Sequence, residues 1–237
     1  MTRFPIGLTV SAAIAFVLLL GLGRWQIERL HWKQGLLARI AALQHAPPQP
    51  IVAILGRAAA GADIDYTRVA ADCPQVERSA YLRLYSLHDG AAGYRIITAC
   101  VLAAGPYGSV LVDRGFVAQD AAGEASPPPG QVIAQPLVGI LRGGDLKTFV
   151  TPDNQPAQRL FYSRDIPAMA RVLGAVGPAP IFLMLESPAP KSGLPVPTPA
   201  PADIPNNHLE YAVTWFGLAG ALACVYLASL WRRLRSK

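Results

Sequence analysis

The chain offers few residues that could do chemistry. It holds four histidines and three cysteines in 237 residues, with no C-x-x-C or C-x-C pair. A copper carrier or a thioredoxin-like protein would therefore lack its soft ligands. The sequence also lacks G-x-S-x-G, H-E-x-x-H, a P-loop and a G-x-G-x-x-G that follows a strand. We predict that the protein is not an enzyme and that residues 46–207 hold no metal site.

One histidine stands where it could bind a large ligand. His208 comes three residues before an uncharged apolar run, Tyr211–Trp231. Asn206 or Asn207 could cap a helix that begins at this point. We therefore expect His208 in the first turn of a helix, at the boundary between water and lipid.

The residues that follow would share one helical face with this imidazole. Tyr211, Ala212, Trp215 and Ala219 lie at +3, +4, +7 and +11 from His208, and Trp215 would be about 10 Å along the axis. An imidazole, small residues and a flat aromatic on one stripe that partly faces lipid could hold a haem. Alternatively, the aromatic residues are ordinary interfacial anchors and the histidine has no ligand.

A second cluster follows the first apolar run. Trp25, Arg29 and Trp32 lie at i, i+4 and i+7, on one face of a helix. Arg24 or Arg29 could pair with the propionates of a haem. Tryptophan and arginine are also the usual interfacial anchors of a membrane helix, and the sequence leaves both interpretations open.

Two uncharged runs are long enough to cross a membrane. Phe4–Gly23 and Tyr211–Trp231 contain 20 and 21 residues, and a helix needs roughly 20 to cross the hydrocarbon core. We predict that the first run is an uncleaved anchor, because Gly21–Trp25 makes a poor signal-peptide cleavage site. The mean hydropathy of +0.30 agrees with a chain that lies partly in lipid.

The net charge of +6 is an indication of topology. Five of the 21 basic residues lie outside the two spans, at Arg3 and in the tail 231–237. Because basic flanks stay in the cytoplasm, both termini are predicted to be cytoplasmic and the middle domain to be exported. The remaining basic residues nearly balance the 15 acidic ones, so we expect no nucleic-acid partner.

The exported part reads as mainly β. Turn signals separate short segments rich in Val, Ile, Leu and Tyr, and one helix is expected over 163–173. We interpret Asp113–Gly115 as an ordinary turn after a strand, and Arg164 as part of a solvated helix face. Cys73 and Cys100 could pair, although their spacing does not require it. The predicted strands are 66–71, 79–87, 94–103, 109–117, 136–142 and 180–185.

We thus predict a membrane protein in which two transmembrane α-helices, N- and C-terminal, flank an exported α+β domain with a mainly antiparallel sheet. A segment with seven prolines in 20 residues, Glu186–Pro205, is predicted as a stiff connector. The predicted regions are a cytoplasmic N-terminus (1–5), transmembrane helix 1 (6–23), a juxtamembrane helix (24–45), the exported domain (46–185), the connector (186–207), transmembrane helix 2 (208–230) and a basic cytoplasmic tail (231–237).

Several sequence blocks together resemble the surfeit locus protein 1 family of cytochrome c oxidase assembly factors. Each block is weak alone, but they occur in the family's order. They are Gly23-Arg24-Trp25-Gln26 with Arg29, Trp32 and Lys33; Gly93–Thr98; Val112–Val117; Phe149–Asn154; Phe161–Asp165; and Asn207–Phe216. The chain departs from the family pattern at Asp113, Ala99 and Ala118, which affects local turn geometry.

The resemblance implies a protein of the bacterial cell membrane whose large domain is periplasmic. Such a protein would bind haem a transiently and assist its delivery to subunit I of a haem–copper oxidase. Its partners would be subunit I, other oxidase assembly or haem a synthesis proteins, and the lipid bilayer. The haem a site would comprise His208 as iron ligand with Trp215, Tyr211, Arg24, Arg29 and Trp25. The alternative is a scaffold that stabilises subunit I without holding haem.

Overall fold

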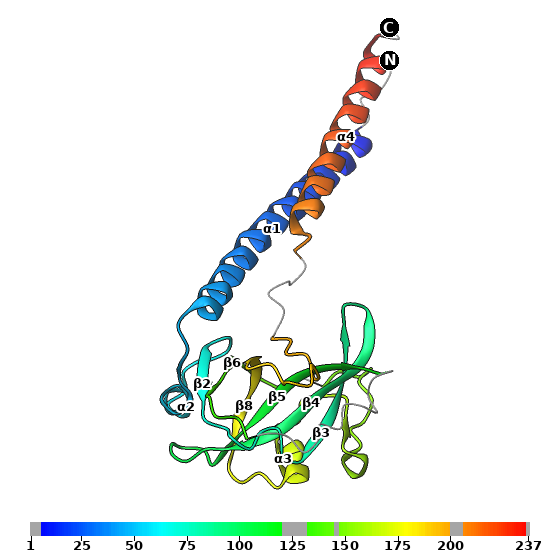
Figure 1. The fold of residues 1–237 in the computed structure, drawn as a ribbon. Coiled ribbons are helices and arrows are strands. Elements are labelled where there is room, and N and C mark those ends of the chain that lie inside the picture. The colour runs from blue at the N-terminus through cyan, green and yellow to red at the C-terminus, as the bar shows by residue number, and fades with distance from the viewer. Residues whose placement is uncertain (1–5, 120–131, 145–146, 200–205, 236–237) are drawn as a thin grey trace. The chain divides into compact units, whose positions relative to one another are not determined.

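The structure is a computed structural model that describes residues 6–119, 132–144, 147–199 and 206–235 (Figure 1). The chain divides into two compact units. One comprises Met1–Arg39 with Ala202–Lys237, and the other comprises Ile40–Pro201. The predicted cytoplasmic segment 1–5, with Arg3, and the end of the basic tail at Lys237 lie outside the described residues.

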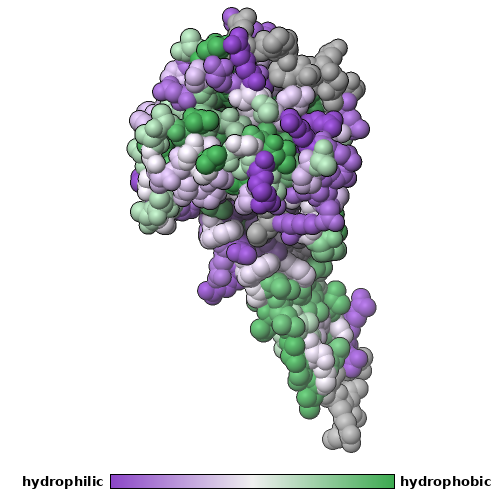
Figure 2. All heavy atoms as spheres, turned by 90° about the horizontal axis from the view of Figure 1, so that it is seen from below, coloured by the Kyte–Doolittle hydropathy of each residue, from purple (hydrophilic) through white to green (hydrophobic). Residues whose placement is uncertain are grey.

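The first unit is a pair of long helices: α1 (Ile6–His45), as far as Arg39, and α4 (His208–Arg235). Both are long and apolar enough to cross a membrane, over Ile6–Leu43 and His208–Arg233. Hydrophobic residues predominate on their outer surface (Figure 2). Since nothing interrupts α1 at the end of the apolar run, the predicted span and the predicted juxtamembrane segment form one helix.

The two helices pack along a seam with a seven-residue period. On α4, buried or half-buried residues recur three and four positions apart, as they do in paired helices. Thr9 and Tyr226 form a hydrogen bond at one end, with 2.7 Å between their hydroxyl oxygens. Near the other end Gly23 faces Phe216, and a Cβ at Gly23 would lie 2.7 Å from the ring. A glycine at this position therefore allows the helices to approach closely.

The second unit is built on one eight-stranded sheet with the order β1-β2-β6-β8-β5-β4-β3-β7. Strands β3, β4 and β5 follow one another in the chain and pair as antiparallel neighbours. The turn signals in the sequence predict this part of the sheet. The strands are β1 (Gln49–Pro50), β2 (Arg68–Ala71), β3 (Tyr81–His88), β4 (Ala91–Val101), β5 (Ser109–Ala118), β6 (Leu137–Arg142), β7 (Leu160–Phe161) and β8 (Pro178–Ser187).

The sheet is mixed, so the prediction of a mainly antiparallel sheet was wrong. Pairs β1–β2, β3–β7 and β5–β8 are parallel, and the other four pairs are antiparallel. The main cause is β8, which inserts between β5 and β6 after the chain has passed through α3 (Ile166–Leu173). Pairing between strands so far apart leaves no local signal such as a hairpin turn.

Helices cover both faces of the sheet. Neighbouring residues of β5 alternate between the two sides: Val112 packs with Ile54 and Leu55 of α2 (Ile51–Ala59), whereas Leu111 packs with Met169 of α3. The prediction of a single helix in this domain missed α2 and a short 3₁₀ turn over Pro156–Gln158. Apolar residues spaced i, i+3 and i+4 after Pro50 were an available signal for α2.

Helix α3 ends where the sequence predicts, at Leu173, but it begins at Ile166 rather than at residue 163. The side chain of Asp165 accepts a hydrogen bond from the N–H of Ala168 at 3.0 Å, and Pro167 lies in the first turn. Gly174 ends the helix in the left-handed conformation, which a glycine adopts at low cost.

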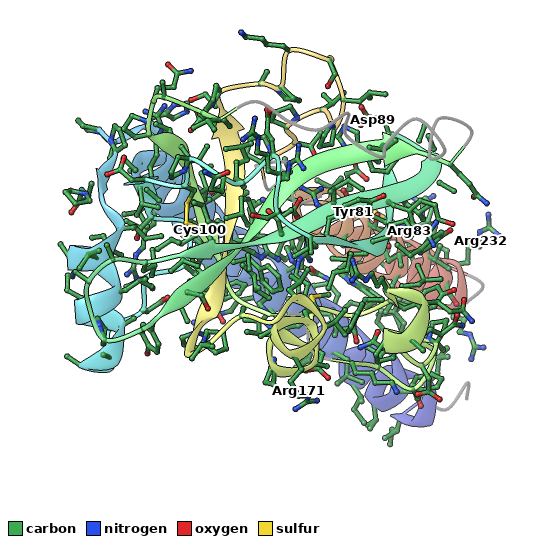
Figure 3. The ribbon with its side chains drawn as sticks, turned by 60° about the horizontal axis from the view of Figure 1, so that its bottom comes forward. Tyr81, Arg83, Asp89, Cys100, Arg171 and Arg232 are labelled. Atoms are coloured by element: carbon green, nitrogen blue, oxygen red, sulfur yellow. A yellow bond between two sulfur atoms is a disulfide. The ribbon has the colours of Figure 1, made fainter. Side chains whose placement is uncertain are left out.

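Cys73 and Cys100 form a disulfide, a pairing that the sequence left open. Cys100 lies on β4, and the bond links this strand to the segment after β2 (Figure 3). Both cysteines are buried in the core cluster on the α2 side of the sheet. Cys224 of α4 is the remaining cysteine and is free.

Candidate functional site

The candidate haem ligand, His208, is the first residue of α4 and is half-buried. The backbone carbonyl of Asn207 accepts a hydrogen bond from the N–H of Tyr211 at 3.2 Å, so the helix begins after the two asparagines. This places His208 in the first turn, as the sequence predicts.

The imidazole has a specific partner on the other helix. Its Nδ1 lies 2.7 Å from Oε1 of Gln26 on α1. Gln26 is buried, with 8% of its surface exposed. An amide oxygen can only accept a hydrogen bond, so Nδ1 carries the proton and donates it. In the neutral imidazole, the second ring nitrogen, Nε2, then has the lone pair, which is the form of histidine that binds a metal.

The small residues of the stripe below His208 face the other helix. Ala212 and Ala219 each expose only 1% of their surface, on the side of α4 that contacts α1. Trp215 is half-buried on the same side. The two alanines therefore face α1, which can approach closely at Gly23, and Trp215 is only half covered. A flat ligand could lie at the end of this seam, beside His208, but not along it while the helices are paired.

Tyr211 remains open, with 55% of its surface exposed. It lies one turn after His208 on α4, outside the buried stripe. It is the described aromatic residue nearest in sequence to His208, and a ligand could reach it without separating the helices.

The residues of α1 that the sequence predicts as part of the haem site do not contact His208 in the same way as Gln26. Arg24 donates from Nε to Glu28 at 2.9 Å in an exposed ion pair within the helix. Trp25 is half exposed. The guanidinium of Arg29 lies 4.9 Å from the centre of the Trp32 ring.

Gln26 is thus the residue that α1 brings to His208. Arg29 lies one turn beyond Gln26 on a neighbouring face, whereas Arg24 and Trp25 lie further round the helix. The sequence reasoning missed Gln26. Its signal was its position between Gly23 and Leu30, three and four residues away, in the seven-residue pattern of the seam.

A second polar cluster lies inside the sheet domain, around Asp113 of β5. Asp113 is fully buried and forms an ion pair with Arg95 of β4, while Nη2 of Arg164 lies 3.7 Å from the same carboxylate. Asp113 also accepts a hydrogen bond from the N–H of Gly115 at 3.1 Å. The interpretation of Asp113–Gly115 as a turn was wrong, because the strand continues to Ala118. Arg164 belongs to this cluster rather than to a solvated face.

The cluster also binds the proline-rich segment. Arg95 donates to the carbonyl of Thr198 at 2.6 Å. Val196 and Phe116 exchange two backbone hydrogen bonds, at 2.8 and 2.9 Å. Gly115 has a φ of +126°, and a Cβ there would lie 2.1 Å from the carbonyl oxygen of Val196. The first part of the predicted connector is therefore attached to the sheet through Thr198.

Arg114 lies beside this cluster in sequence but points to the other face of β5, and only 2% of its surface is exposed. Burial lowers the pKa of its guanidinium, and the negative charge of Glu77 partly opposes this shift. Among the residues that the structure describes, no three His, Cys, Asp or Glu side chains gather as a metal site would require.

Comparison with known proteins identifies a family. A family model described as the SURF1 family matches residues 13–220. Surfeit locus protein 1 of Mus musculus is 28% identical over 229 residues, which cover 90% of this chain and 72% of the mouse protein. The SURF1-like protein of Drosophila melanogaster is 30% identical, with 90% and 74% covered. The SURF1-like protein of Monosiga brevicollis is 32% identical, with 93% and 85% covered.

Proposed function

Because this chain belongs to the SURF1 family, we propose that it is an assembly factor for a haem–copper cytochrome c oxidase that binds haem a and assists its delivery to subunit I. The family resemblance carries the oxidase role. The contact between His208 and Gln26 carries the haem role, because it leaves one imidazole nitrogen with a lone pair at the end of a membrane helix.

The residues present fit a haem at one place. His208 would supply an axial ligand to the iron through Nε2, and the ring is half-buried. Tyr211 would contact the edge of the porphyrin, and Arg29 is the arginine best placed to meet a propionate. Arg24 would first have to leave Glu28. Trp215 would support the site from within the seam, and Trp25 would act as an interfacial anchor.

Haem a is cargo in this proposal, and a single protein ligand suits that role. Because His208 is the one iron ligand proposed here, an acceptor protein could take over haem a by supplying a ligand of its own. The protein would thus hold haem a in passing and perform no catalysis of its own. Subunit I and the enzymes that make haem a are the partners that this role requires.

The proposed location is a bacterial cell membrane, with both termini in the cytoplasm and the sheet domain in the periplasm. The basic end of α4, with Arg232, Arg233 and Arg235, supports this orientation. The disulfide between Cys73 and Cys100 also supports it, because such bonds persist in oxidising compartments.

The test is a visible spectrum of the protein purified in detergent from cells that make haem A. The parent should show a Soret band that scales with protein, and His208→Ala should lose most of it while the protein is still produced in equal amount. His31→Ala is the matched control, because His31 is an exposed histidine of α1. If His208→Ala copurifies with as much haem a as the parent, the haem assignment is wrong.

The alternative is a scaffold that stabilises subunit I without holding haem. The exposed apolar residues of the sheet domain favour it: Phe149 is fully exposed and 71% of Val150 is exposed, in a turn held by Thr148 and Thr151. Phe149→Ser with Val150→Ser tests this role. A loss of assembled oxidase in this variant, together with full haem a loading in oxidase from the His208→Ala strain, would favour the scaffold.

A further inference from the structure

We infer that Gln26 is a positioning residue, which fixes the protonated nitrogen of His208 and thereby selects Nε2 as the atom that meets an iron-bearing tetrapyrrole. The inference deepens the proposed function and rests on it. The geometry behind it is the 2.7 Å contact between His208 Nδ1 and Gln26 Oε1.

The buried position of Gln26 supports a role in orienting His208. It lies in the part of α1 that follows the first apolar run, yet its side chain is buried against the partner helix. Burial of an amide without a partner is unfavourable, so this contact stabilises the residue in its place. Gly23, one turn earlier, lets α4 approach closely enough for the contact to form.

The contact has a chemical consequence for the imidazole. A neutral imidazole carries its proton on either nitrogen, and the two forms present different atoms to a metal. Because the amide oxygen of Gln26 accepts a hydrogen bond, it favours the form with the proton on Nδ1. The same bond fixes the ring orientation and makes Nε2 a stronger donor to iron, as outer partners of metal-binding histidines do.

The alternative is that the bond only joins the two helices. In that case the amide could be replaced by any group that keeps the helices together, and the form of the imidazole would not matter. Thr9 and Tyr226 supply a comparison, because they join the same two helices by a hydrogen bond far from His208.

The first experiment needs no haem. The full chain labelled with ¹⁵N-histidine is placed in detergent micelles, and the ring nitrogens of its four histidines are observed by NMR. His208→Ala identifies the His208 signals. The parent should show a protonated Nδ1 and an unprotonated Nε2, whereas Gln26→Met, of similar length, should give a mixture of the two forms. Gln26→Glu, which still accepts a hydrogen bond, should keep the parent pattern.

The second experiment measures haem binding by the same variants. Gln26→Met should weaken haem affinity about 10- to 100-fold, the usual effect of losing such an outer partner. It should also lower the Fe–histidine stretching frequency in resonance Raman spectra of the reduced protein. Gln26→Glu should keep both the haem affinity and the Fe–histidine frequency close to those of the parent. Thr9→Val, which removes the hydrogen bond to Tyr226, should leave the frequency unchanged.

The outcomes separate the two proposals. If His208→Ala keeps its haem, the proposed haem role fails, whatever Gln26 does. If His208→Ala loses haem but Gln26→Met keeps the parent form of the imidazole and the parent affinity, only the role of Gln26 is overturned. A loss of haem in Gln26→Met and Thr9→Val alike, without a change in the Fe–histidine frequency, would also overturn it, because it would show that joining the helices is sufficient.

Discussion

The guanidinium of Arg95 pairs with the carboxylate of Asp113 inside the sheet domain, where 8% and 0% of the two side chains are exposed. The same arginine binds the carbonyl of Thr198. One ion pair therefore joins two neighbouring strands and the segment that leads out of the domain. Ion pairs buried to this extent are strongly sensitive to the loss of one partner.

Asp113→Asn should destabilise the sheet domain by about 3–5 kcal/mol, because it leaves the buried Arg95 without its negative partner. The free energy of unfolding of the full chain in detergent, measured by denaturant titration, checks this. Asp153→Asn is the control, since Asp153 pairs with Lys147 on the surface and should matter little. Equal stability of Asp113→Asn and the parent would contradict the prediction.

Replacement of Gly23 by leucine should weaken the pairing of α1 and α4 by about 1–3 kcal/mol, because the added side chain would overlap the ring of Phe216. Phe216→Ala in the same chain should restore part of the loss. Thermal unfolding of the helices in micelles, followed by circular dichroism, measures both effects. Gly21→Leu is the matched control, since a Cβ at Gly21 meets nothing within 4 Å.

Removal of the disulfide by Cys73→Ala with Cys100→Ala should cost the sheet domain about 3 kcal/mol, because the bond closes a loop with a sequence separation of 27. Denaturant titration measures the loss. Thiol labelling of the denatured parent gives an independent check. Without a reductant only Cys224 should react, and labelling of all three cysteines would show that the bond is absent from the isolated protein.

The proposed orientation is tested by fusion to an alkaline phosphatase, which is active only after export. A fusion after Lys237 should be inactive, because the basic tail keeps that end in the cytoplasm. A fusion after Ser192, beyond the last strand, should be active. Activity at Lys237 would reverse the topology.

The sequence predicts the parts of this fold that have local signals. The apolar runs predict the membrane helices, the turn residues predict β3, β4 and β5, and the segment 163–173 predicts α3 to within three residues. The insertion of β8 between β5 and β6 depends on contacts far apart in the chain, for which no local signal exists.

In the candidate site, too, the sequence predicts the features that have local signals and misses those that depend on distant contacts. The position of His208 at the start of a helix follows from its asparagine neighbours and the apolar run. Its contact with Gln26 does not, because it joins residues 182 positions apart. The direction of the stripe from Ala212 to Ala219 could not be derived from α4 alone, since small residues suit both a ligand and a partner helix.

The two edge strands of the sheet affect how readily the domain could pair with another chain. A long exposed edge strand can template pairing with another chain. Here the outermost strands, β1 and β7, contain only two residues each. β1 ends in Pro50, which has no N–H to donate, and its chain turns at once into α2. The outermost strands themselves therefore offer little backbone on which another chain could pair.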